Sequence, residues 1–193
     1  MLAVGTPTGR RRGVWISLIG FMGSGKSTVA SLLGERALLP VVDLDREIVR
    51  REGAGIGELF RSRGETGFRA AELAALNALA PDADLVVACG GGLVTTPAAV
   101  ARLRASGCVI WLDAPWETLQ TRLAAAAAAG DDRPLLAAGD WEAARALDGA
   151  RRPLYARAAD FRVRTDQTAP EVTARRALTR HVAWQRQRAA VGT

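Results

Sequence analysis

Residues 14–28 read Val-Trp-Ile-Ser-Leu-Ile-Gly-Phe-Met-Gly-Ser-Gly-Lys-Ser-Thr, an apolar run that leads directly into a glycine-rich turn. The turn, Gly20 to Thr28, fits the phosphate-binding pattern G-x-x-x-x-G-K-[ST], with a predicted strand before it and a helix-like stretch after it. Glycines let backbone N–H groups turn toward phosphates, and the start of the helix adds its partial positive charge. The stretch therefore predicts an α/β fold with a nucleoside triphosphate site.

Lysine occurs once in the chain, at position 26, and arginine carries the remaining positive charge. An ammonium on a flexible stem follows the β- and γ-phosphates as a compact point charge, whereas a guanidinium is planar and bulkier. We therefore expect Lys26 to be irreplaceable by arginine. Ser27 offers the hydroxyl that usually completes a Mg²⁺ shell.

The composition indicates one globular domain, predicted over 14–188, after a flexible arm at 1–13. No apolar run reaches the ~18 residues that span a bilayer, and the arm lacks the apolar core of a secretory signal. Two cysteines, Cys89 and Cys108, have no metal-like spacing, so we expect a reduced, cytoplasmic setting.

The net charge of +6 has two interpretations, a nucleic-acid surface or a site for anionic ligands. The arginines are scattered at helical spacings beside acidic residues, without interleaved aromatic side chains. We therefore expect no nucleic-acid partner. His181 lies in an arginine-rich stretch and is predicted to be a surface residue.

Short apolar runs alternate with longer helical ones, which favours a parallel sheet covered by helices, here a three-layer α/β/α fold with five strands. The predicted strands are 14–19, 40–42, 85–88, 108–112 and 161–164. The predicted helices are 27–38, 45–52, 56–62, 66–79, 97–105, 116–129, 140–156 and 170–188. Ligands in such sheets bind beyond the carboxyl ends of the strands.

Two carboxylates follow the second predicted strand, as Asp43-Leu44-Asp45. Alternate positions point to the same side, so both can face the phosphate loop, one toward Mg²⁺ and one toward a substrate hydroxyl. The alternative is an acidic N-cap for the next helix, a role that Asp45 can fill.

Further along, Arg69 lies in the first turn of a predicted helix, where the macrodipole disfavours a cation. A bound anion would explain an arginine at this position. Its alternative is a surface arginine paired with Glu65 or Glu72. The third strand ends in three glycines, 90–92, which permit close backbone approach and offer N–H donors to a ligand.

Two arginine motifs complete the set, Arg-Pro-Leu-Leu at 133–136 and Arg-Arg-Pro-Leu-Tyr at 151–155. Arg133 follows a hinge-like Gly-Asp-Asp and can close over a transferring phosphoryl group as part of a lid. Arg151 lies on a predicted helix and can bind a carboxylate bidentately.

In this order the motifs at 20–28, 43–45, 64–69, 90–92, 133–136 and 151–155 resemble those of the shikimate kinase family, over roughly 14–180. The resemblance implies transfer of the ATP γ-phosphoryl group to the 3-hydroxyl of shikimate, with Mg²⁺, by a protein of the P-loop kinase fold with a mobile lid at 124–138. We expect a monomer, because the chain is one compact domain with no evident exposed apolar helix. The residues implied to bind ATP are Gly23, Ser24, Gly25, Lys26, Ser27, Thr28, Arg122 and Arg133. Those implied to bind shikimate are Asp45, Arg69, Gly90, Gly91, Gly92 and Arg151, with Ser27 and Asp43 on the metal and Lys26, Asp45 and Arg133 catalytic.

The chain departs from the family pattern at a few places. The segment between Arg122 and Arg133 is longer and alanine-rich, and Asp-Gln-Thr at 166–168 replaces basic residues near adenine. The alternatives are a kinase of a related cyclic acid such as aminoshikimate, a kinase of gluconate or of a nucleoside monophosphate, and a non-catalytic nucleotide-binding module that docks on nucleic acid.

Overall fold

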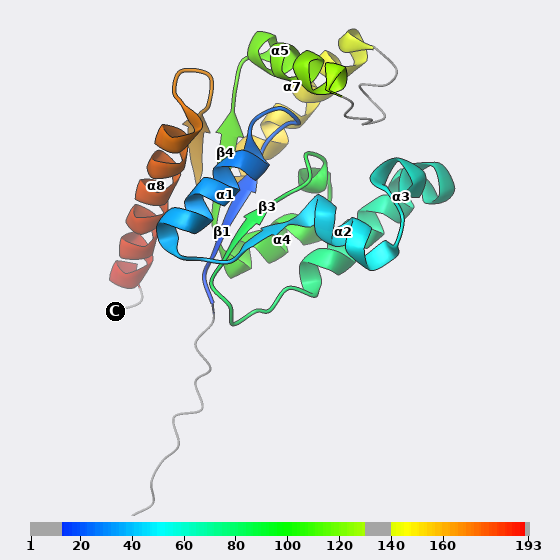
Figure 1. The fold of residues 1–193 in the computed structure, drawn as a ribbon. Helices are drawn as coiled ribbons and strands as arrows, with labels where there is room; N and C mark the ends of the chain where they lie inside the picture. The colour runs from blue at the N-terminus through cyan, green and yellow to red at the C-terminus, as the bar shows by residue number, and fades with distance from the viewer. Residues whose placement is uncertain (1–12, 130–139, 192–193) are drawn as a thin grey trace, which may run out of the picture.

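The computed structural model describes residues 13–129 and 140–191, where strands alternate with helices (Figure 1). The strands are β1 (Trp15–Ile19), β2 (Val41–Asp43), β3 (Leu85–Ala88), β4 (Gly107–Asp113) and β5 (Phe161–Arg164). The helices are α1 (Lys26–Ala37), α2 (Leu44–Glu52), α3 (Ile56–Asn77), α4 (Pro97–Ser106), α5 (Trp116–Ala128), α7 (Trp141–Ala158) and α8 (Pro170–Val191), with a 3-10 turn η1 at Leu93–Thr95. The elements predicted from sequence are present within a few residues of their expected bounds.

The strands form one parallel sheet in the order β2-β3-β1-β4-β5. On β1, Leu18 lies opposite Ala88 of β3 on one side and Ile110 of β4 on the other. Because the strands are parallel, the loops that follow them leave from one edge, where such sheets bind ligands. The phosphate loop after β1 and the triple glycine after β3 therefore meet at this edge.

Helices cover both faces of the sheet, and every residue of β1 is therefore buried. Ile16 and Leu18 pack in the core beneath α1 and α8, whereas Trp15 and Ile19 pack in the core formed with α3 and α4. Figure 1 shows α5 and α7 beyond the strand ends toward which the arrowheads of β1 and β4 point. The predicted three-layer α/β/α arrangement is confirmed.

The two helices predicted over 56–79 are confirmed: they are the two limbs of α3, which meet at a non-helical break at Gly64. Gly64 has φ 66° and ψ −176°, a conformation that glycine adopts without steric cost. The rings of Phe60 and Phe68 stack across the break with centroids 4.3 Å apart. Aromatic packing therefore joins the two limbs that the backbone kink separates.

The prediction that His181 lies on the surface is wrong, since this residue is only 6% exposed. Ala174, Ala177 and His181 follow one helical stripe, and this stripe of α8 faces the sheet and α1. The imidazole stacks on Trp184 with ring centroids 6.2 Å apart.

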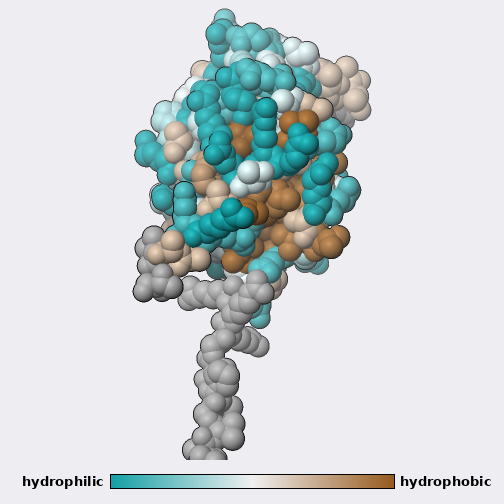
Figure 2. Space-filling model, turned by 90° about the vertical axis from the view of Figure 1, so that its left-hand side faces the viewer, coloured by the Kyte–Doolittle hydropathy of each residue, from teal (hydrophilic) through white to brown (hydrophobic). Residues whose placement is uncertain are grey.

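Figure 2 views the molecule from the side on which α8 lies in Figure 1. It shows hydrophilic side chains over most of this surface, with apolar areas between them. None of the helices in the described ranges is long and apolar enough to cross a membrane.

Candidate active site

The phosphate loop is held open by glycines with left-handed backbone. Gly23 and Gly25 have φ 76° and 90°, and α1 begins at Lys26 directly after Gly25. Gly25 has no side chain to occupy the first N–H groups of α1, so these donors can face an anion. The Lys26 Nζ donates to the carbonyl oxygens of Gly20 and Phe21, each at 2.9 Å. The ammonium therefore lies folded over the loop that is expected to cradle the phosphates.

The end of β2 brings a carboxylate to the start of α1. The Ser27 hydroxyl donates to Asp43 Oδ2 at 2.7 Å, and the other carboxylate oxygen of Asp43 accepts the backbone N–H of Arg46 at 3.3 Å. Asp43 is thus the N-cap of α2, and the alternative that assigned this capping role to Asp45 is wrong. Asp45 lies in the first turn of α2 and does not cap the helix, and its carboxylate lies beside Gly90 of the triple glycine.

Asp45 and Glu72 approach each other across Gly90. A Cβ atom at Gly90 would lie 2.8 Å from Asp45 Oδ1 and would overlap the carboxylate of Glu72, so a side chain here would displace both carboxylates. Burial raises the pKa of Glu72 above its ordinary value, and the negative charge of Asp45 adds to this effect against the opposing charge of Arg69. The substrate side of the site therefore contains a buried carboxylate as well as the arginines predicted from sequence.

Arg69 makes both ion pairs of the surface interpretation, yet it is not a surface residue. Its Nη1 lies 2.6 Å from Glu72 Oε2 and its Nη2 lies 3.2 Å from Glu65 Oε1, while the side chain is only 14% exposed. The guanidinium packs so closely on Gly92 that a Cβ atom there would overlap it. The acidic neighbours therefore hold Arg69 against the triple glycine.

Arg151 comes to the same place from α7 and is 8% exposed. Burial lowers the pKa of its guanidinium, and the nearby charge of Arg69 lowers it further. One turn along α7, the Tyr155 hydroxyl donates to the carbonyl oxygen of Gly91 at 2.6 Å. In the described residues, Arg69 Nε, Glu72 Oε1 and Arg151 Nε are buried without a hydrogen-bond partner. Buried polar atoms normally have partners, so this cluster indicates a place for a polar ligand.

Arg122 of α5 joins the phosphate loop to the loop after β5. Its Nη1 donates to the carbonyl oxygen of Gly23 at 3.2 Å, and its Nη2 donates to that of Thr165 at 2.6 Å. A shallow hollow of about 350 Å³ lies beside it, lined by Glu117, Thr118, Thr121 and Arg122. Arg133 and most of the predicted lid lie outside the described residues. The described part of that segment continues α5 to Ala128.

A parallel sheet in this order, with a phosphate loop after β1 and a buried arginine pair beside a triple glycine, defines a small-molecule kinase of the P-loop class. The family model for shikimate kinase matches residues 22–181. The chain belongs to the shikimate kinase family.

Relatives of this family match most of the chain. The shikimate kinase of Persephonella marina is 40% identical over 80% of this chain and 91% of that protein, and the enzyme of Symbiobacterium thermophilum is 43% identical over 79% and 87%. The structure of shikimate kinase from Acinetobacter baumannii in complex with shikimate is 34% identical, with a TM-score of 0.79 over 90% of this chain and 94% of that one. A gluconokinase from Sinorhizobium meliloti is 16% identical, with a TM-score of 0.52, and shares the fold alone. These matches do not support the aminoshikimate alternative.

Some polar residues near the site have no role in the sequence-based prediction. Glu72 enters that prediction only as a surface partner of Arg69, because its burial depends on how α3 packs. Asp113 ends β4 just as Asp43 ends β2, at the same edge of the sheet. An aspartate at the end of an apolar strand could therefore have predicted that Asp113 lies near the site. Tyr155 gives no such signal, since its hydrogen bond reaches a distant backbone carbonyl.

Proposed function

We propose that this protein transfers the γ-phosphoryl group of ATP to the 3-hydroxyl of shikimate, giving shikimate 3-phosphate and ADP on the route to chorismate and the aromatic amino acids. The observation that carries the proposal is the pair of largely enclosed arginines, Arg69 and Arg151, each with a buried Nε that has no hydrogen-bond partner among the described residues. Shikimate has one carboxylate and three hydroxyls. Two guanidinium groups beside Asp45 and the glycines at 90–92 are a matching set of donors and acceptors.

The phosphate loop binds the nucleotide in this proposal. Backbone N–H groups from Gly23 to Thr28 surround the β- and γ-phosphates, and the Lys26 ammonium swings from its carbonyl partners to the phosphate oxygens. Arg122 lies against Gly23 and is proposed to contact the adenine nucleotide from α5. Arg133 is proposed to approach the transferring group from the lid.

The transfer itself requires little covalent help from the protein. The substrate oxygen attacks the γ-phosphorus, the bond from that phosphorus to the bridging oxygen of ADP breaks, and the proton of the attacking hydroxyl passes to the Asp45 carboxylate. Asp45 suits this role because it lies beside Gly90 and is not used to cap α2. Most of the acceleration is expected from positioning and charge neutralisation.

Ser27 and Asp43 are proposed to hold the Mg²⁺ that accompanies ATP. Their 2.7 Å contact pairs a hydroxyl with a carboxylate at the start of α1, and such oxygen donors suit an ion that keeps several waters and bridges to phosphates. When bound, the ion neutralises charge on the β- and γ-phosphate oxygens. The described residues contain no cluster of three or more ligating side chains for a cage made of protein groups alone.

The function is tested by measuring ADP release from MgATP with and without shikimate. We expect turnover that requires shikimate and stops when EDTA removes the metal. Aminoshikimate is tested in parallel under the same conditions. A strong preference for aminoshikimate, or ATP binding without turnover on shikimate, would overturn the substrate assignment while leaving the nucleotide site intact.

We also propose that the protein acts as a cytoplasmic monomer without a nucleic-acid partner. Cys89 and Cys108 are free and buried, as expected in a reducing compartment. In the described part of the chain, the exposed large apolar side chains are few: Leu38, Val41, Val49 and Val182. Sedimentation at micromolar concentration and an electrophoretic shift with duplex DNA at physiological salt test these two points. A stable dimer, or a shifted band, would contradict them.

A further inference from the structure

The arginine that follows Arg151 has no place in the proposed substrate site, yet it is strongly paired. The Arg152 guanidinium bridges two carboxylates, with Nη2 2.6 Å from Asp113 Oδ1 and Nη1 3.2 Å from Asp148 Oδ2. Asp113 is the last residue of β4 and is only 2% exposed. Arg162 of β5 also donates to it, from Nε at 2.8 Å. A buried carboxylate at the end of β4 thus ties α7 to the sheet.

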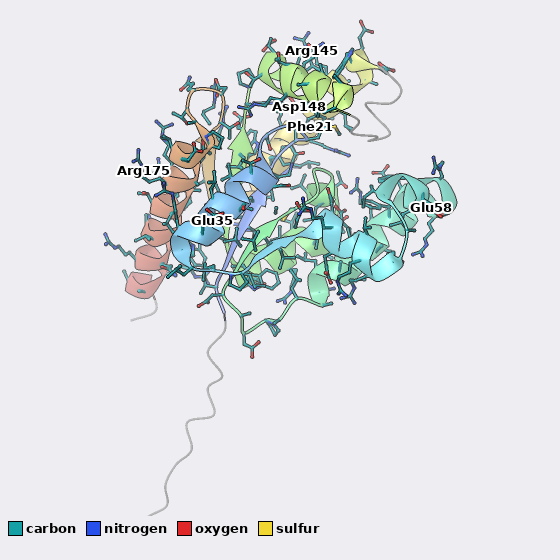
Figure 3. The ribbon with its side chains drawn as sticks, viewed as in Figure 1. Phe21, Glu35, Glu58, Arg145, Asp148 and Arg175 are labelled. Atoms are coloured by element: carbon teal, nitrogen blue, oxygen red, sulfur yellow. The ribbon has the colours of Figure 1, made fainter. Side chains whose placement is uncertain are left out.

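The turn of α7 that carries both arginines is weakened in its backbone. Pro153 lies inside the helix and has no N–H, so the carbonyl of Gly149 loses its helical donor, a change that costs a helix interior about 3 kcal/mol. Asp148 and Arg152 are four residues apart, so their ion pair spans this same turn. Figure 3 shows Asp148 on α7 at the same end of the sheet as Phe21 of the phosphate loop. Side chains therefore supply a connection that the proline removes from the backbone.

Arg151 needs such support because burying its guanidinium among the side chains of α3 and α7 is costly. The nearby charge of Arg69 adds to this cost and favours a shift of Arg151 away from it, while Glu65 and Glu72 offset part of the repulsion. Opposing this, Tyr155 stacks on Trp111 with ring centroids 5.8 Å apart, and Arg152 lies over the same indole at 5.4 Å. The part of α7 that directly follows Arg151 is thus anchored to β4.

We propose that Arg152 is a positioning residue for the substrate carboxylate. By bridging Asp113 and Asp148, it holds the proline-weakened turn of α7 so that Arg151 faces Arg69 before substrate binds. This inference rests on the proposed role of Arg151 as a carboxylate ligand. A guanidinium suits the task because its fixed fork of donors reaches two carboxylates at once, whereas an ammonium is a single point of charge.

The test compares Arg152→Met, Arg152→Lys and Arg145→Met by initial rates of ADP release, with shikimate varied at saturating MgATP and then the reverse. Arg145 is an exposed arginine on the same helix and serves as the matched control (Figure 3). We expect Arg152→Met to raise the shikimate KM on the order of tenfold to a hundredfold, with the ATP KM unchanged, because small misplacements of a binding group have effects of this size. Arg152→Lys should fall between wild type and Arg152→Met, and Arg145→Met should match wild type.

A double-mutant cycle separates positioning from general destabilisation. If Arg152 acts through Arg151, adding Arg152→Met to Arg151→Met raises the shikimate KM no further. Independent, multiplicative effects would overturn the inference, as would an unchanged shikimate KM in Arg152→Met. If Arg152→Met does not fold, Arg152→Lys and Asp113→Asn enter the same cycle, with the same two outcomes. A wild-type protein without shikimate-dependent turnover contradicts the proposed function. If the wild type is active but the two substitutions act independently on the shikimate KM, only this inference is contradicted.

Discussion

Replacing Arg69 by methionine removes one of the two guanidinium groups proposed to bind the substrate carboxylate, while keeping an unbranched apolar stem. In the free protein, Arg69 already uses Nη1 on Glu72 and Nη2 on Glu65, and its Nε is buried without a partner among the described residues. The substrate carboxylate therefore adds charge-assisted hydrogen bonds to a group that is held in place beforehand. A hydrogen bond to a charged group contributes about 1.5–3 kcal/mol.

At about 1.4 kcal/mol for each factor of ten, that loss corresponds to a rise in the shikimate KM of roughly 10- to 150-fold. The ATP KM should stay near its wild-type value, because the hydrogen bonds of Arg69 go to Glu65 and Glu72 on its own helix and its guanidinium packs on Gly92. Rates of ADP release measure both constants. Arg63→Met is the matched control, since Arg63 also lies on α3 and pairs with Glu52 at 2.7 Å on an exposed surface.

Loss of Arg69 also leaves the buried Glu72 without its cation, and breaking a buried pair in this way costs about 3–5 kcal/mol. Glu72 can avoid part of this cost by taking up a proton, since burial already raises its pKa. Urea unfolding of Arg69→Met, with and without Glu72→Gln, measures this term separately. Equal changes in the shikimate and ATP constants, or an unchanged shikimate KM in a folded variant, would refute the carboxylate role of Arg69.

Three further predictions concern other residues. Lys26→Arg should nearly abolish turnover in a folded protein, because the ammonium fits between two carbonyl oxygens at 2.9 Å and a planar guanidinium does not; retained kcat would contradict this. Gly92→Ala should raise the shikimate KM more than the ATP KM, since its Cβ overlaps the Arg69 guanidinium, whereas Gly55→Ala meets open space and should match wild type in the same rate assay. Burial lowers the pKa of His181, the single histidine, against the opposing charge of Asp84, so the folded protein keeps it neutral while the unfolded chain takes up a proton below about pH 6.5. The free energy of unfolding should therefore fall as pH drops from 7.5 to 5.5, and less so in His181→Leu; identical urea midpoints at each pH for both proteins would show that His181 does not contribute.

The sequence was sufficient wherever the relevant residues are neighbours along the chain. The phosphate loop is such a case, because a strand, glycines with left-handed φ and the first turn of α1 follow one another within 14–28. The parallel sheet was also predictable, since its apolar runs are short and separated by helical stretches. Local patterns also marked Arg69, Arg151 and the triple glycine as candidates, and the family resemblance then assigned them to the substrate.

Other features depend on how distant segments pack, and a local pattern contains no record of that packing. The capping of α2 by Asp43 was decided by backbone geometry that the residue types alone left open. His181 looked like a surface residue because its neighbours are arginines, but the stripe of α8 that it shares with Ala174 and Ala177 faces the core.

The arrangement of charged residues on the substrate side of the site depends most on the tertiary structure. Sequence named Arg69 and Arg151 separately, and only the packing of α3, α7 and the turn after β3 brought them together with Glu72. The bridge from Arg152 to Asp113 likewise joins α7 to the end of β4. Residue type determines what chemistry a side chain can perform. The fold determines which charged side chains are buried together. It therefore also determines which of them have partners within the protein and which can bind a ligand.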